Sequence, residues 1–333
     1  MIGRTARTTT ARTTFVTVLV LAALAASAGP VDARAAIAWP TQSSGDRGTD
    51  VLAIQYLLRA RLAGSSAALP PVDGLFRSTT DTAVRAFQVA RGLPPNGIVA
   101  WATWGGLIQR LGRGPSGDAV RALQVELVAK VRAPIAVSGS FGAGTEASVI
   151  AFQRHTGLAQ TGVVDTTTWR TLVWHYQLPH FGSTSLCDYS VGNGAANWGT
   201  AEAIGTLQAV GRSIVALGYG RVAVGDVSFE LGGPIPGHVT HQVGLDVDVR
   251  PLRRANDQCS IAGTTWRSSA YDRTATRAMI LKFRASAAGH VKLIYFNDPI
   301  LIAEGLTTWH TGHDDHLHVR FCEASHPLAT YVC

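Results

Sequence analysis

Residues 237–249 read GHVTHQVGLDVDV, and this stretch decides the fold of the C-terminal half of the chain. Its end alternates, so that in a strand Val247 and Val249 fall on one face and Asp246 and Asp248 fall on the other. A strand of this kind packs its apolar face against a core and presents its ionisable face elsewhere. The stretch therefore predicts a sheet with a polar site on one side.

A second stretch, GHDDHLHVRF at 312–321, follows the same rule and places His316, His318 and Arg320 on one strand face. A helical pattern followed by short β-rich runs predicts an α+β domain with a largely antiparallel sheet. The expected elements are a helix over 201–219 and strands over 222–231, 244–251, 291–296 and 316–321.

Six of the eleven histidines fall in two short clusters, namely His238, His241, His310, His313, His316 and His318. Histidines clustered with aspartates on strand faces are typical of a metal site, and these donors suit Zn²⁺ with three protein ligands and a water. A metal-free acid–base pair would leave the other clustered histidines unexplained. We therefore predict one zinc ion. The remaining histidines are expected to be ordinary surface or core residues: His155, His175, His180, His290 and His326.

The N-terminal half contains an internal repeat. The matched segments are GTDVLAIQYLL (48–58) with GDAVRALQVEL (117–127), VDGLF (72–76) with VSGSF (137–141), TAVRAFQVARGL (82–93) with ASVIAFQRHTGL (147–158), and NGIVAWATWGGL (96–107) with TGVVDTTTWRTL (161–172). Apolar residues recur at helical spacing and glycines mark the turns, so each copy is predicted to form about three helices. Phe87, Phe152, Trp104 and Trp169 are expected in the core.

These two copies resemble the peptidoglycan-binding domain that accompanies many bacterial wall hydrolases. The resemblance rests on a DVxxLQxLL-like opening, a DGxFGxxTxxAVxxFQxxxGL middle and a G(I/V)VxxxTWxxL close, and it covers residues 44–109 and 111–173. The first copy lacks the second glycine of the middle motif, and the second copy lacks its aspartate. The resemblance implies that both repeats bind the cell wall.

The spacing H-x₆-D from His241 to Asp248, followed some 70 residues later by H-x-H, resembles the lysostaphin-like, D-Ala-D-Ala metallopeptidase group. The penicillin-insensitive murein endopeptidase family is the closer match. Its GHxSHQxGLDVD motif corresponds to 237–248, where Thr240 replaces the usual serine, and its HxxHxHVR motif corresponds to 313–320. The similarity covers roughly residues 180–333.

The resemblance implies that His241, Asp248 and His318 bind the zinc ion. Asp246 is expected to orient a ligand or a nearby backbone group. An H-E-x-x-H helix, a G-x-S-x-G elbow and a P-loop are all missing from the sequence, so other catalytic templates are not indicated.

The resemblance also implies that His316 is the general base near the water on the metal, with His313 and His238 in support. His316 and His318 share a strand face, so one can bind the metal while the other moves protons. A solvated loop is the expected environment of Trp309, Asp314 and Asp315, and the alternative is that they line the active-site cleft.

Residues 1–28 read as a secretory signal peptide with a basic start, an apolar centre and an Ala-Ser-Ala end, and Ala35 ends a second possible cleavage site. The alternative, an uncleaved membrane anchor, is disfavoured because the apolar run is shorter than the roughly 20 residues that span a bilayer. Cleavage lowers the formal net charge from +7 to +4, since three arginines are removed. A mildly basic protein suits an anionic wall and lacks the basic clusters of nucleic-acid binding.

The four cysteines, Cys187, Cys259, Cys322 and Cys333, are even in number and show no C-x-x-C spacing, which in an exported protein predicts two disulfides. Their order along the chain suggests pairing Cys187 with Cys333 and Cys259 with Cys322, although three pairings are possible.

Taken with the two resemblances, these features predict a secreted zinc-dependent murein endopeptidase that its two repeats tether to the cell wall. The expected location is extracellular or at the cell wall, and periplasmic if the host has an outer membrane. Peptidoglycan is the expected substrate and tether, with no nucleic-acid partner and no membrane contact after signal cleavage. Two alternatives remain, a non-catalytic peptidoglycan-binding protein with a structural zinc site and a D,D-carboxypeptidase acting on stem peptides.

Overall fold

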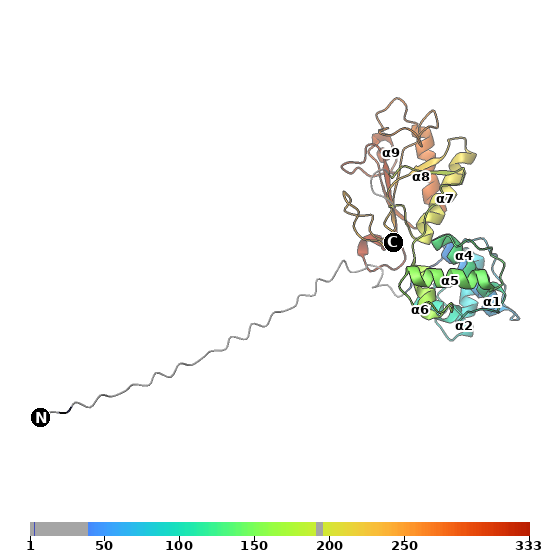
Figure 1. The fold of residues 1–333 in the computed structure, drawn as a ribbon. Coiled ribbons are helices and arrows are strands. Elements are labelled where there is room, and N and C mark those ends of the chain that lie inside the picture. The colour runs from blue at the N-terminus through green and yellow to red at the C-terminus, as the bar shows by residue number, and fades with distance from the viewer. Residues whose placement is uncertain (1–2, 4–38, 191–195) are drawn as a thin grey trace. The chain divides into compact units, whose positions relative to one another are not determined.

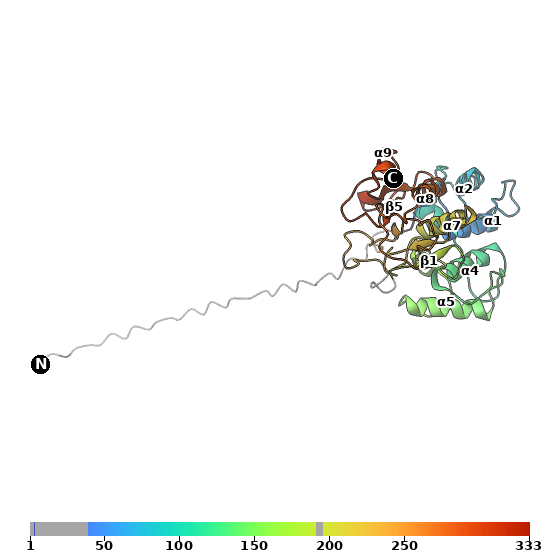
Figure 2. The same ribbon diagram turned by 90° about the horizontal axis from the view of Figure 1, so that it is seen from above.

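The structure is a computed structural model that describes Gly3, residues 39–190 and residues 196–333. The residues described from Trp39 onward belong to one compact unit, and Figures 1 and 2 show a helical part followed along the chain by a part with a sheet. The predicted signal peptide and both cleavage sites lie outside the described residues, Gly3 excepted. Among the described helices, none combines the length and the apolar character needed to cross a bilayer.

The helical part contains three helices for each sequence repeat, as predicted. Repeat 1 holds α1 (Thr49–Leu62), α2 (Ser78–Ala90) and α3 (Trp101–Leu107), and repeat 2 holds α4 (Asp118–Val131), α5 (Ala143–His155) and α6 (Thr166–Trp174). The two repeats share one hydrophobic core, since α1 packs against α4. Phe87, Phe152, Trp104 and Trp169 are all buried in that core, which confirms their predicted role.

A buried glutamine fixes the turn after each of four helices. Each side-chain Oε1 accepts a hydrogen bond from the backbone N–H of a left-handed glycine, in the pairs Gln55–Gly74, Gln88–Gly97, Gln124–Gly139 and Gln153–Gly162. Each Nε2 donates to a backbone carbonyl and to a threonine hydroxyl further along. Each repeat is therefore built from two similar helix-and-turn modules.

We expect Gln153→Ala to lower the free energy of unfolding by about 2–4 kcal/mol, because it leaves buried backbone groups without partners. The Gly162 N–H and the Val163 carbonyl both lose the bonds they make to Gln153, at 3.0 and 2.9 Å. Urea denaturation followed by tryptophan fluorescence measures the change. Gln160→Ala is the matched control, since Gln160 is exposed and should change stability by less than about 0.5 kcal/mol. Equal effects of the two substitutions would contradict the role of Gln153.

The C-terminal part is an α+β domain with a five-stranded, mostly antiparallel sheet, as predicted. Its strands, in the order β1-β2-β3-β5-β4, are Leu186–Asp188, Val222–Val224, Asp246–Val249, Leu317–Phe321 and Val291–Tyr295. Only β1 and β2 run parallel to each other in the described sheet. The helices are α7 (Ala201–Ala216), α8 (Arg273–Ser286) and α9 (Pro299–Ala303), and Ala329–Tyr331 form a 3₁₀ turn, η1.

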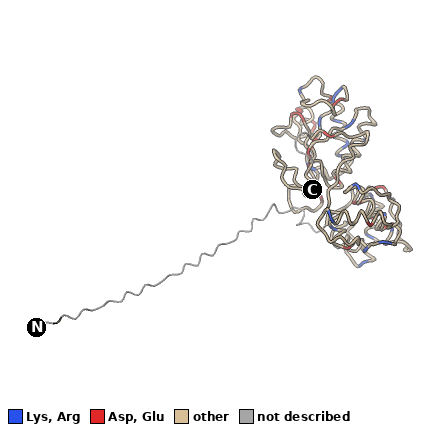
Figure 3. The backbone as a smooth tube through the Cα atoms, in the orientation of Figure 1, with Lys and Arg blue, Asp and Glu red and all other residues tan. Residues whose placement is uncertain are grey.

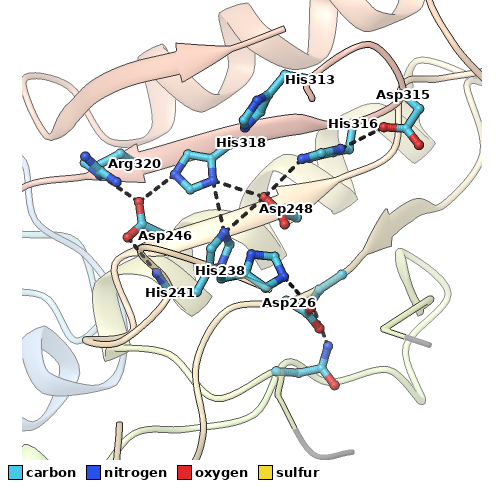
Figure 4. A network of polar contacts seen from close by, with 12 residues as sticks. Asp226, His238, His241, Asp246, Asp248, His313, Asp315, His316, His318 and Arg320 are labelled. Atoms are coloured by element: carbon cyan, nitrogen blue, oxygen red, sulfur yellow. Dashed lines mark hydrogen bonds and ion pairs between the residues drawn. The ribbon is translucent and has the colours of Figure 1, made fainter. Parts of the chain in front are cut away.

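Strand alternation divides the two faces of the sheet as the sequence predicts. Val247 of β3 and Val319 of β5 are fully buried in the same apolar core as Phe283 of α8. The carboxylates of β3 and the histidine of β5 contact one another instead, as Figure 4 shows. The core thus supports a polar cluster on the neighbouring strands β3 and β5.

Several elements differ from the sequence prediction in extent. The strand expected over 222–231 ends at Val224, and the chain then leaves β3, since the Val227 N–H donates to the Ala196 carbonyl at 2.7 Å. The helix expected over 201–219 ends at Ala216, just before the left-handed Gly218. Strand β1 was not predicted.

The predicted number of disulfides is confirmed and the suggested pairing is wrong, since the bonds are Cys187–Cys259 and Cys322–Cys333. Strand β1 pairs with β2, and Gln258 donates to the Arg221 carbonyl just before β2, which brings Cys259 to Cys187. The segment after β5 turns back on itself through a bridge between Glu323 and Val332, which brings the last two cysteines together.

Candidate metal centre

The antiparallel pairing of β3 and β5 brings the two histidine-rich stretches together. Asp248 is the direct cross-strand partner of His318, and Asp246 is the partner of Arg320. Directly opposed side chains on one face of an antiparallel pair lie within contact distance. Residues some 70 positions apart in the sequence thus become neighbours.

Three potential ligand atoms form a compact triangle at this point (Figure 4). His241 Nε2 lies 3.0 Å from His318 Nδ1 and 3.3 Å from Asp248 Oδ1, and His318 Nδ1 lies 3.2 Å from Asp248 Oδ1. Ligands about 2.0–2.1 Å from a tetrahedral zinc ion are separated by about 3.3 Å. All three side chains are buried, so the triangle has the size that such an ion requires.

His241 reaches the triangle from a strained backbone position. Its φ angle is 65°, in the left-handed region that favours glycine. Its N–H donates to Asp246 Oδ2 at 3.2 Å, which helps to hold this conformation. Strain of this kind persists where the surrounding structure imposes it, and it is concentrated at functional sites.

Asp246 orients His318, in keeping with its expected role. Its Oδ1 contacts His318 Nε2 and accepts from Arg320 Nε, both at 2.7 Å, and its Oδ2 accepts from the Tyr331 hydroxyl at 2.5 Å. Burial alone would raise the pKa of Asp246, but the hydrogen bond to His318 and the charge of Arg320 hold it well below its usual range. With Nε2 bound to a carboxylate, the Nδ1 atom of His318 is directed into the triangle.

The electrostatics of the triangle favour positive charge. Burial lowers the pKa of His318, but its hydrogen bonds to Asp246 and Asp248 outweigh burial and raise the pKa to about 9. Burial opposes ionisation of Asp248, yet the adjacent His241 keeps the pKa of that carboxyl well below its ordinary value. The site therefore stabilises a cation more strongly than bulk water does.

His316 lies beside the triangle, and a carboxylate orients it. Its Nδ1 lies 2.9 Å from Asp315 Oδ1, and its Nε2 lies 3.9 Å from Asp248 Oδ1. When the Nδ1–H of His316 donates to the carboxylate, Nε2 is the basic nitrogen of the ring. This Nε2 is directed toward the triangle. Asp315 thus contacts the site, which was the alternative to the solvated loop expected from the sequence.

His238 approaches the triangle from the other side. Its Nε2 lies 3.0 Å from Asp226 Oδ2, and its ring centroid is 4.5 Å from that of His241. His238 belongs to the same cluster, because one of its ring nitrogens lies within 4.8 Å of a ligand atom of His241 and of one of Asp248. The sequence pattern did not identify Asp226, which precedes the histidines by several residues.

His313 lies over His316 without entering the triangle. Their ring centroids are 4.7 Å apart, and the Nδ1 of His313 is 2.9 Å from the Thr311 carbonyl. Burial lowers the pKa of His313 to about 4, so this imidazole is neutral at neutral pH. Its supporting role toward His316 stays a prediction.

The rest of this loop is held by Asn297, which the sequence pattern also missed. Asn297 Nδ2 donates to Asp314 Oδ1 at 2.8 Å and to the His310 carbonyl at 2.9 Å. Asp314 is paired with Arg267, and Trp309 is largely exposed. Both observations agree with the expected solvated loop.

A buried His–Asp–His set with an oriented histidine beside it is typical of hydrolases that bind zinc. Residues 191–290 match the family model described as penicillin-insensitive murein endopeptidase. Residues 47–107 and 116–172 each match the model described as putative peptidoglycan binding domain. The chain therefore contains two peptidoglycan-binding domains followed by a peptidase domain of the penicillin-insensitive murein endopeptidase family.

Two curated proteins are similar to parts of the chain. Zinc D-Ala-D-Ala carboxypeptidase of Streptomyces albus G is 32% identical over 124 residues, which cover 37% of this chain and 44% of that protein. N-acetylmuramoyl-L-alanine amidase CwlM of Mycobacterium tuberculosis is 36% identical over 110 residues, covering 29% of this chain and 27% of that protein. The chain thus spans less than half the length of either relative.

Among solved structures, one similar protein is a peptidoglycan-binding protein from Clostridioides difficile in complex with glutamine hydroxamate. It is 31% identical, with a TM-score of 0.19, and the match covers 19% of this chain and 40% of that one.

Domains that act on the cell wall, together with two disulfides, indicate an extracytoplasmic protein. Figure 3 shows basic residues interspersed with acidic ones over the described part of the chain.

Proposed function

We propose that this protein is a secreted zinc-dependent endopeptidase that hydrolyses peptide cross-links of peptidoglycan, with both repeats bound to the cell wall. The triangle of His241 Nε2, Asp248 Oδ1 and His318 Nδ1 is the observation that carries the proposal. The family of the peptidase domain supports the choice of substrate.

The residues of the triangle fit a zinc ion. Asp248 Oδ1 is buried and lies 3.3 Å from His241 Nε2 and 3.2 Å from His318 Nδ1. A buried carboxylate oxygen facing two imidazole nitrogens is costly unless a positive charge lies between them. Two imidazoles and one carboxylate match the donor sets of catalytic zinc sites. His241, Asp248 and His318 would hold one ion.

Zinc bound here would supply Lewis acidity toward water and the scissile carbonyl. His316 Nε2 takes a proton from the attacking water and delivers it to the leaving amine nitrogen. Asp315 stabilises the charge that His316 acquires, because its carboxylate lies 2.9 Å from Nδ1. Asp246 keeps His318 in the tautomer that directs Nδ1 inward.

The repeats would raise the local concentration of the enzyme on an insoluble substrate. Linking a binding module to a catalytic module makes the encounter with substrate effectively intramolecular. Because the two copies share one core, they would meet the wall as one unit. Secretion by the signal peptide at 1–28 would deliver the protein to the wall.

Digestion of purified sacculi tests the proposal. We expect the mature protein to convert cross-linked muropeptide dimers into monomers, to lose this activity after chelation and to regain it with added Zn²⁺. Mass spectrometry of the released fragments identifies the products. Tight sedimentation with sacculi and no release of fragments would favour a non-catalytic binding protein and contradict the proposal. Loss of terminal D-alanine with intact cross-links would show a carboxypeptidase instead.

A further inference from the structure

A second group of metal-binding side chains lies outside the candidate active site. Glu230 Oε1, in the turn after β2, is 2.8 Å from the Nε2 of His155, the last residue of α5. The same oxygen is 3.4 Å from the Nε2 of His175, the residue after α6. These ligand atoms lie within 4.8 Å of one another. All three side chains belong to the same compact unit.

The tautomer of His175 presents a lone pair to this group. Its Nδ1 lies 2.7 Å from the Tyr176 carbonyl, and because a carbonyl only accepts, Nδ1 carries the proton. In a neutral ring, Nε2 is then an acceptor, and it lies 3.4 Å from Glu230 Oε1. Fixing one ring nitrogen on a carbonyl so that the other binds an ion is the usual arrangement of metal-ligating histidines.

His175 is also rigidly placed. Its ring packs edge-on against Phe152 at 5.9 Å and Trp198 at 5.7 Å between centroids, and its side chain is almost wholly buried. His155 is half exposed and can adjust its position. An ion could therefore enter from solvent on the side of His155 and bind to the fixed ring of His175.

We propose that His155, His175 and Glu230 form a second Zn²⁺ site, distinct from the one at Asp248. The set contains two imidazoles and one carboxylate, a known donor combination for zinc. The 3.4 Å between Glu230 and His175 is close to the separation of about 3.3 Å expected for ligands of a tetrahedral ion. The site opens onto a cavity of about 630 Å³ that His155 and Glu230 help to line, which leaves room for water as the fourth ligand.

An ion at this site would join repeat 2 to the peptidase domain. His155 and His175 belong to the end of the helical part, whereas Glu230 belongs to the segment between β2 and β3. That segment continues to His238 and His241 of the candidate active site. The second ion would therefore fix the repeat against the segment that supplies active-site residues, whether or not the proposed peptidase activity exists.

Zinc counting on the purified mature protein tests the inference. After chelation and reloading with Zn²⁺ alone, mass spectrometry should find two ions per wild-type chain, one in His155→Ala, one in His318→Ala and none in the double variant. We expect the Zn²⁺ affinity of the second site to fall by more than about 100-fold in His155→Ala. Mutating a residue that only orients a metal ligand lowers metal affinity by about 10- to 100-fold, and removing a ligand itself should lower it further. One ion in the wild type that disappears in His318→Ala alone would overturn the inference.

Two further variants separate a metal site from a simple hydrogen bond between histidine and glutamate. Glu230→Gln keeps a hydrogen-bonding side chain of the same shape, so an unchanged zinc count in Glu230→Gln would show that the group binds no metal. His180→Ala removes an exposed histidine from the connection between the two domains and should leave two ions bound. Because the count needs no substrate, it is independent of the result with sacculi.

Discussion

His318→Ala is expected to remove the active-site zinc and to lower kcat/KM on cross-linked muropeptides by about 1,000-fold or more. A bound metal contributes several kcal/mol to the stabilisation of the transition state, and about 4 kcal/mol corresponds to a factor of about 1,000. The side chain of His318 contacts both other proposed ligands and the orienting Asp246. Its loss therefore removes one ligand and the contact that positions it.

Because His318 is buried, the variant needs a control for folding. Asp248→Asn is nearly isosteric and should also lose the metal, while both variants keep the circular dichroism spectrum of the wild type. His310→Ala is the matched negative control, since His310 is an exposed histidine of the same segment that stacks on Tyr295. Full zinc content and activity in both His318→Ala and Asp248→Asn would rule out this ligand set.

The sequence was sufficient to predict most of the sheet and the strand faces that carry the proposed ligands. Alternation in 244–249 and 316–321 decides which side chains share a face, and that periodicity is a local property of a strand. The pairing of Asp248 with His318 depends in addition on strand order and register. The family resemblance implied their proximity, and the structure shows the register that produces it.

The residues that position the site were harder to predict, because they come from segments without periodicity. Tyr331 contacts Asp246 from the 3₁₀ turn near the end of the chain, and Asp226 contacts His238 from the segment after β2. A lone tyrosine or aspartate in a loop carries no pattern. Its role depends on tertiary contacts, which only the folded chain reveals.

The disulfide pairing shows the same limit. Sequence order favours nested pairs, but bonds form between cysteines that the fold brings within reach. Cys187 on β1 lies beside β2, and the turn that carries Cys259 packs against the residues just before β2. No local signal in the sequence predicted β1, so the pairing could not be derived.

His316→Ala is expected to keep the active-site zinc and to lower kcat by about 100- to 10,000-fold, with a small change in KM. General acid–base catalysis contributes a factor of this size. The Nε2 of His316 is 3.9 Å from Asp248 Oδ1, outside the triangle whose edges are 3.0 to 3.3 Å. The residue can therefore reach a reacting water without binding the metal. Zinc counting and steady-state kinetics on a muropeptide dimer measure the two effects separately.

Asp315→Asn distinguishes a proton-transfer role of His316 from a structural one. Asparagine can still accept a hydrogen bond from His316 Nδ1 but no longer stabilises its charge, so kcat should fall with zinc content and melting temperature unchanged. If His316→Ala stayed fully active, the base would have to be another group. If it lost zinc instead, His316 would be a ligand. His318 Nδ1 belongs to the triangle, whereas His316 Nε2 lies outside it and a different carboxylate orients its ring. Comparing the two alanine variants therefore tests whether metal binding and proton transfer are carried by different histidines.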